Sequence, residues 1–205
     1  MMNKVKREDS VEQTENYWLE NLSPQFATLI IVLVAYALNG PAYPFVGNIV
    51  WLPLGAMSLC FLLFGFRVVL AALLATQLSE FWFQSQPFFD QGTLILNVFG
   101  VIGPIVAIAS MRFFKLSNFF DGSKLIFQHL VFLAILTAFF NTIISFFVTS
   151  FIASNDSSIE PINATLFIKN FLIGDILGCL IVLLFAAIVV VPLIQYFFPR
   201  LVPSE

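Results

Sequence analysis

The sequence predicts an all-α, polytopic membrane helix bundle. Of its 205 residues, 60% are hydrophobic and only 10% are charged, and the mean hydropathy is +0.96. A soluble domain is usually about 45–50% apolar and about 25% charged. The apolar residues form long unbroken runs, as membrane-spanning helices do, whereas β-barrels show alternating segments of about ten residues. Helices also satisfy their own backbone groups where lipid offers no hydrogen-bond partner.

Six spans are expected, at residues 26–38, 49–64, 66–83, 93–114, 125–153 and 166–198. They form one transmembrane domain over residues 25–198. The link between the second and third spans is very short, which predicts a tight antiparallel hairpin. Pro192 is expected to bend or end the last span.

The two ends of the chain are polar. Residues 1–24 are expected to be a cytoplasmic tail, either partly disordered or carrying a short interfacial helix with Trp18 at headgroup depth. Residues 199–205 are expected to be a short cytoplasmic tail.

The basic residues indicate the orientation. Lys and Arg concentrate on the cytoplasmic side of membrane proteins. With a cytoplasmic amino terminus, six spans place both termini and eight of the nine basic residues on that side, and only Lys169 outside. The eight are Lys4, Lys6, Arg7, Arg67, Arg112, Lys115, Lys124 and Arg200.

Asp175 is a carboxylate within the apolar stretch "FLIGDILGCL". Such a group costs roughly 2.5–3.5 kcal/mol at membrane depth, and a functional role is the default hypothesis for it. Gly174 and Gly178 form a small-xxx-small pattern, so we expect another helix to press closely against this stretch. Asp175 follows Lys169 by six residues, roughly 9 Å along a helix, which predicts a position in the outer half of the membrane.

Other polar residues fall at a similar depth. We therefore expect a shared polar pocket that opens outward, formed by Glu80, Asn97, Thr149, Lys169 and Asp175. A polar stripe at four-residue spacing in the fifth span offers partners for the carboxylate: Thr137, Asn141, Ser145 and Thr149. The alternative is that these residues only hold helices together by hydrogen bonds of about 0.6 kcal/mol each.

A second landmark is "VWLPLGAM", residues 50–57. Trp51 is expected at interface depth, where tryptophan anchors membrane helices. Pro53 suits the first turn of a helix because its missing N–H costs nothing there. Gly55 allows close packing, and Arg67 is expected at the cytoplasmic turn, with its charged end reaching the lipid phosphates. We interpret this segment as an anchored helix start rather than an active site.

Enzymatic activity is not expected. His129 is the one histidine, and the sequence has no HExxH motif, no Gly-rich phosphate loop and no Ser-His-Asp set. Cys60 and Cys179 lie in apolar runs and are interpreted as small hydrophobic residues. We expect no metal, no cofactor and no nucleic-acid partner.

Taken together, "WLPLG", "LLFGFRVVLAALLATQL" and "IGDILGCLIVLLFAAIVVVPLI" resemble the MASE1 family of bacterial membrane sensor domains, over roughly residues 30–195. The positions that carry the resemblance are Trp51, Pro53, Gly55, Gly65, Arg67, Gly174, Asp175, Gly178 and Pro192. The resemblance implies a multi-pass sensing domain in the bacterial cytoplasmic (inner) membrane. In that family, a cytoplasmic output module commonly follows, such as a diguanylate cyclase, a phosphodiesterase or a histidine kinase. No such segment is present here, so we expect the signal to pass to a separate protein.

Three functions are compatible with these features. The first is a sensor or scaffold that receives a periplasmic or lipid ligand, or a partner's membrane helix, and supports signalling or an envelope process. The second is the substrate-binding component of a small-molecule importer. The third is an assembly factor that has only a protein partner. The Gly174/Gly178 stripe suits a homodimer contact as well as an internal one.

Overall fold

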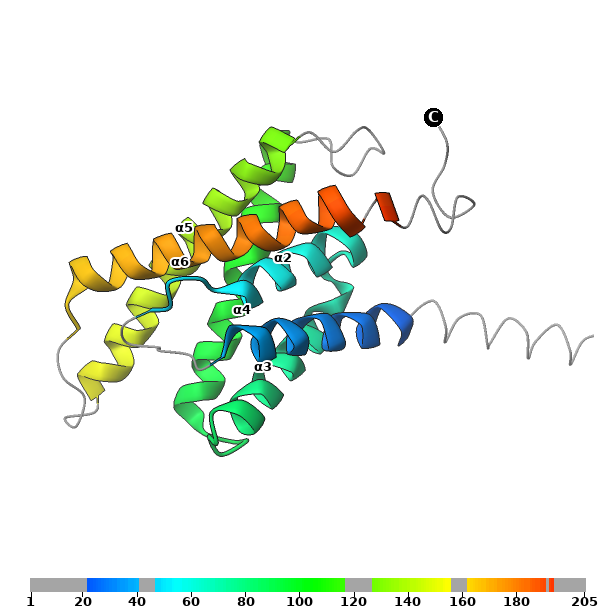
Figure 1. Cartoon of the computed structure of the whole chain (residues 1–205). Coiled ribbons are helices and arrows are strands. Elements are labelled where there is room, and N and C mark those ends of the chain that lie inside the picture. Colours follow the sequence, from blue (N-terminus) through cyan, green and yellow to red (C-terminus); the bar gives the residue numbers. More distant parts are fainter. Residues whose placement is uncertain (1–21, 41–46, 117–126, 156–161, 191, 194–205) are drawn as a thin grey trace, which may run out of the picture.

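The computed structural model describes residues 22–40, 47–116, 127–155, 162–190 and 192–193, and its described elements are all helical (Figure 1). The all-α bundle predicted from the sequence is confirmed. Residues 1–21 and 199–205 lie outside the described part, and so do the predictions made for Trp18 and for the two tails. The first five helical segments begin and end within four residues of the predicted spans, whereas the sixth, predicted to run to residue 198, is described as helical only to Val190 and at residues 192–193.

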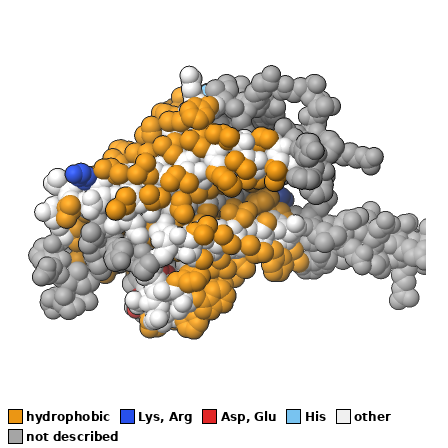
Figure 2. Space-filling model, viewed as in Figure 1, with side chains coloured by type: hydrophobic (Ala, Val, Ile, Leu, Met, Phe, Trp, Pro, Cys, Tyr) orange, Lys and Arg blue, Asp and Glu red, His pale blue; other side chains and the backbone are white. Residues whose placement is uncertain are grey.

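The helices follow one another in this order: a first helix (Leu22–Asn39), α2 (Leu52–Phe64), the 3-10 turn η1 (Phe66–Val68), α3 (Val69–Phe83), α4 (Gln91–Phe113), α5 (Phe127–Asn155), α6 (Ala164–Phe185) and the π-helical turn η2 (Ala186–Val190). Within the described residues, five helical segments are long and apolar enough to cross a membrane, and α2 is a shorter apolar helix of 13 residues. The chain is therefore a multi-pass membrane protein. Figure 2 accordingly shows hydrophobic side chains over most of the visible face and charged ones near its ends.

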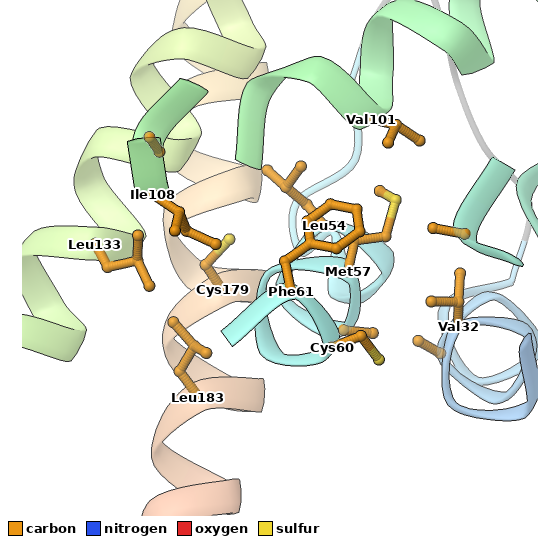
Figure 3. Close-up of a cluster of buried hydrophobic side chains, with 14 of the residues drawn as sticks. Val32, Leu54, Met57, Cys60, Phe61, Val101, Ile108, Leu133, Cys179 and Leu183 are labelled. Carbon is orange, nitrogen blue, oxygen red and sulfur yellow. The ribbon is translucent and has the colours of Figure 1, made fainter. Parts of the chain in front are cut away.

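The short helix α2 lies in the middle of the bundle. At about 1.5 Å per residue it is about 20 Å long, less than the roughly 30 Å of a bilayer core. Its side chains are buried around most of its circumference, as expected of a helix that is apolar on every face. Figure 3 shows Met57 and Phe61 of α2 among side chains of the first helix, α4, α5 and α6. The core is thus built around α2.

The prediction that the second and third spans form a tight hairpin is wrong. After the turn at Gly65, α2 packs mainly against α6 and α4, and α3 packs mainly against α4. The first helix, rather than a direct contact between the two, connects α2 and α3. Its Tyr36 ring meets the Trp51 ring edge-on at 5.4 Å and lies beside Ser79 of α3. The short link forces only the ends of α2 and α3 together, and Gly65 permits the turn with a φ of +72°.

One end of the bundle carries Arg67 and Arg112; we call it the basic end. Arg67 bonds through Nε to the Phe64 carbonyl at 3.0 Å, and its own carbonyl accepts a hydrogen bond from Gln25 at 2.7 Å. The Arg112 guanidinium lies 5.2 Å from the centre of the Phe66 ring. Arg67 and Arg112 therefore sit together, where α2 ends and α4 ends.

The start of α2 meets the middle of α6 at two glycines. A Cβ on Gly174 would lie 2.0 Å from the Asn48 carbonyl oxygen, and one on Gly178 would lie 2.0 Å from the Trp51 carbonyl oxygen. The Trp51 N–H donates to the Gly174 carbonyl at 2.9 Å. The Leu52 N–H at the start of α2 has no partner within its own helix, and it donates instead to the Asn39 side-chain oxygen at 2.8 Å. Backbone contact at this distance leaves no room for any side chain.

We expect Gly178→Ala to destabilise the protein, because the new methyl group would force α2 and α6 apart. Overpacking of this kind costs about 1–3 kcal/mol. Gly100→Ala is the matched control, since a Cβ at this helical glycine meets nothing within 4 Å, and alanine favours a helix by up to about 1 kcal/mol. The measurement is the melting temperature in detergent. Unfolding is monitored with a fluorogenic reagent that reacts with the two buried thiols, Cys60 and Cys179, once they become exposed. An unchanged melting temperature for Gly178→Ala would show that the contact is looser than described.

Candidate functional site

A cavity of about 590 Å³ lies at the end of the bundle opposite the basic end; we call this the cavity end. It is formed where the first helix, the start of α2, α3, α4, α5 and α6 converge. Its lining residues are Tyr36, Gly47, Asn48, Trp51, Leu54, Met57, Thr76, Glu80, Gln84, Gln86, Asp90, Gly92, Thr93, Leu96, Asn97, Gly100, Asn141, Ser145, Thr149, Ile152, Phe171 and Asp175. This size is typical of small-molecule sites, which measure about 300–1,000 Å³.

Asp175 of α6 contributes a buried carboxylate to this cavity. Its side chain is 1% exposed, and its Oδ2 accepts a hydrogen bond from Asn141 Nδ2 of α5 at 2.7 Å. The amide oxygen of Asn141, Oδ1, is buried and has no hydrogen-bond partner among the described residues. An unsatisfied buried acceptor costs about 1–3 kcal/mol. The pair therefore holds together α5 and α6 but leaves one acceptor unused.

Helix α4 positions Asn141 from the other side. A Cβ on Gly103 would lie 2.9 Å from the Cβ of Asn141 and 3.1 Å from its backbone nitrogen. Only a glycine lets the α4 backbone approach α5 this closely. Asn141 is thereby held between α4 and α6, with its side chain 5% exposed. The local geometry fixes the amide next to the carboxylate.

Asn97 has a different role, although it also lines the cavity. Its Nδ2 donates to Gln77 Oε1 of α3 at 3.0 Å, and Gln77 in turn donates to the Phe88 carbonyl. This chain of hydrogen bonds joins α3, α4 and the loop between them. Asn97 thus holds one wall of the cavity in place.

Asp90 stands at the entrance of the cavity and begins α4. Its Oδ2 accepts a hydrogen bond from the Thr93 backbone N–H at 2.8 Å, the usual arrangement of a helix N-cap. This bond holds the pKa of the Asp90 carboxyl below its usual value. The entrance therefore carries a negative charge at neutral pH.

The cavity lining is electrostatically one-sided. Among the described lining residues there are three carboxylates, those of Glu80, Asp90 and Asp175, and no Lys, Arg or His. Within the described part of the chain, no three His, Cys, Asp or Glu side chains come close enough to hold a metal ion. The carboxylates are thus spread around the cavity rather than gathered at one point.

The structure brings together most of the residues expected in an outward-facing pocket. Glu80, Asn97, Asn141, Thr149 and Asp175 all line the cavity. Lys169 does not: it is exposed on α6, away from the lining. Asp175 is the twelfth of the 27 residues of Ala164–Val190. It therefore lies in the first half of this helical segment, toward Lys169, and its position in the outer half of the membrane stays a prediction.

The motif residues around α2 take three positions. Gly55, Gly174 and Gly178 lie behind the cavity, in the contact between α2 and α6, where a Cβ on Gly55 would lie 2.7 Å from the Gly178 carbonyl oxygen. Pro53 is buried in the first turn of α2, and Arg67 lies at the basic end.

The structure places Trp51 beside the middle of α6, and its depth in the membrane stays a prediction. Its backbone packs against Gly178, the fifteenth residue of α6, and its side chain lines the cavity. Because α2 is a short helix, its start lies within the bundle.

The lining residues that the sequence analysis did not place in a pocket include Tyr36, Asn48 and Phe171. Tyr36 ends an ordinary apolar run, and Phe171 is one of 26 phenylalanines, so neither carries a signal. Asn48 lies just before the predicted second span, where no local pattern links it to a cavity. Its neighbour Gly47, with a φ of +84°, packs against Phe171, which brings this segment to α6.

Comparison of the chain with protein-family models, with curated proteins and with solved structures finds no match. The cavity itself offers carboxylates, hydrogen-bonding amides and hydroxyls, and aromatic and aliphatic side chains. Such a lining can hold a small molecule by charge, hydrogen bonds and apolar contact.

We expect water to reach the interior of the cavity from the cavity end. Ser145→Cys, which places a thiol in the lining, should react with a small charged methanethiosulfonate reagent in lipid nanodiscs. Phe147→Cys is the matched control, because this position on the same helix is 67% exposed on the outer surface of the bundle and would face lipid. The native thiols of Cys60 and Cys179 are buried and should add little background. Equal labelling of both variants, or of neither, would contradict a water-filled cavity.

Proposed function

We propose that the protein is a non-enzymatic membrane receptor of the MASE1-like kind in the bacterial cytoplasmic membrane. It binds a small ligand in the cavity and passes the signal to a separate protein. The observation that carries this proposal is the buried Asp175–Asn141 pair at the wall of a 590 Å³ cavity. A carboxylate is a costly group for merely joining helices within a membrane, and such groups usually serve function.

The distribution of charge gives the direction of signalling. Arg67 and Arg112 lie at the basic end, which the positive-inside rule assigns to the cytoplasm. The cavity end, with Asp90, then faces the periplasm. A ligand would enter from outside, and a cytoplasmic partner or anionic lipid would contact the basic end.

Helix α2 is suited to connect the two ends. Its start lies at the cavity, where Trp51 and Leu54 are lining residues, and its end leads through Gly65 to Arg67. A ligand that contacts this start more favourably in one packing of α2 than in another would shift the population toward that packing. The shift would appear at the basic end as a change in the turn that carries Arg67.

An importer component is the second candidate, because a cavity of this size that opens at one end also suits substrate capture. Such a protein would need an energising partner and would accumulate its substrate in the cell. Uptake of the bound molecule into deletion and complemented strains distinguishes it from a receptor, which moves nothing across the membrane. An assembly factor without a ligand would show only a protein partner.

The test is a native purification of the tagged protein from its own membrane, with mass spectrometry of both the proteins and the small molecules. We expect a bound small molecule together with a stoichiometric signalling or envelope protein. Asp175→Asn, which keeps the shape of the side chain, should lose the small molecule and abolish the function in a deletion strain.

Asn97→Leu serves as the comparison variant, since Asn97 pairs with Gln77 and supports the cavity wall. It should lower stability more than it lowers ligand occupancy per folded molecule. Full complementation by Asp175→Asn, with the small molecule still bound, would show that the carboxylate is structural. A partner protein without any small molecule would favour the assembly factor.

A further inference from the structure

We infer that the ligand of this cavity is a small organic cation that carries a primary ammonium group. This inference rests on the proposed receptor function and names the chemical class that the cavity would accept. Three independent features of the cavity lead to it: its charge, an unused acceptor and its apolar surface.

The charge of the lining favours a cation. Glu80, Asp90 and Asp175 face a cavity that has no basic lining residue. A cation beside a buried carboxylate offsets the cost of its burial, whereas an anion would add repulsion in surroundings where water screens little. Asp90 at the entrance would also attract cations from solution. Anionic ligands are thereby disfavoured at the entrance and in the interior.

The unused acceptor favours N–H donors. Asn141 is 5% exposed and lines the cavity, and its Oδ1 has no hydrogen-bond partner. In the structure, Nδ2 of Asn141 faces Oδ2 of Asp175, which is the orientation that suits a charged carboxylate. A primary ammonium has three N–H donors, enough for the carboxylate and the amide oxygen together. On binding, the Asn141 side chain would turn so that the buried Oδ1 accepts one N–H of the ammonium, and the ammonium would replace Nδ2 as the hydrogen-bond donor to Asp175.

The remaining lining favours an organic cation over a metal ion. Metal ions require several ligands at one point, and the described carboxylates are not gathered in that way. Trp51, Tyr36 and Phe171 provide aromatic surface, which attracts organic cations and packs against their carbon skeletons. Leu54 and Met57 add aliphatic contact.

The experiment is calorimetric titration of the full chain in lipid nanodiscs at neutral pH. The probes are two amines, phenethylamine and cadaverine, and their neutral counterparts of similar shape, 2-phenylethanol and pentane-1,5-diol. The N-trimethylated form of phenethylamine keeps the charge but has no N–H donor. We expect at least one amine to bind about tenfold more tightly than its alcohol. We also expect phenethylamine to bind more tightly than its trimethylated form.

Variants assign the effect to named groups. Asp175→Asn should weaken amine binding about tenfold or more, because a buried charge is lost. Asp90→Asn removes a charge at the solvated entrance while asparagine still caps α4, so binding should weaken less than about threefold. Glu80→Gln is a second interior variant in case Asp175→Asn does not fold. Calcium and magnesium chloride are titrated in the same way.

Four results would overturn the inference: no binding of either amine, equal or tighter binding of the alcohols, binding of the metal ions alone, or amine binding unchanged in both Asp175→Asn and Glu80→Gln. The receptor proposal fails separately. If a neutral or anionic molecule copurifies and is lost in Asp175→Asn, the receptor proposal is supported and the inference of an amine ligand is wrong. If nothing copurifies and no probe binds, both fail.

Discussion

The contact between the start of α2 and the middle of α6 is the constraint on which the rest of this structure depends. Gly174 and Gly178 bring two backbones so close that a single methyl group would collide with the carbonyl oxygens of Asn48 and Trp51. The hydrogen bond from Trp51 to Gly174 closes the contact, and Asn39 satisfies the next donor. A helix too short to span the membrane can therefore begin inside the bundle with its backbone groups satisfied.

The cavity follows from that arrangement. Because α2 starts deep in the bundle, it does not fill the space between its start and the cavity end. That space is the cavity, and it is lined by the chain segment before α2 and by the facing sides of α3, α4, α5 and α6. The same glycine stripe that seats α2 also places Asp175 one residue away, against Asn141. Packing and site chemistry are thus built from one short stretch of α6, and any ligand there would touch the helix that leads to Arg67.

Several features of the site could be predicted from the sequence because they rest on local rules. The cost of a carboxylate in an apolar run singled out Asp175, and the four-residue spacing of small residues indicated a close helix contact at Gly174 and Gly178. Asn141 was a candidate partner because of its polar stripe. The prediction that Lys169 belongs to the pocket was wrong, because the sequence indicates how far along its helix a residue lies but not whether that face of the helix meets the cavity.

The sequence by itself determined that this protein is a multi-pass helical membrane protein, where its helices lie, and which buried polar groups deserve a functional interpretation. These properties follow from hydropathy and helical periodicity, which act over a few turns of one segment. Only the tertiary structure decided that Asn141 is the partner of Asp175, that the first helix contacts both α2 and α3, and that Tyr36, Asn48 and Phe171 line the cavity. Those outcomes depend on which helix faces come together, and that is settled by packing among residues far apart in the chain.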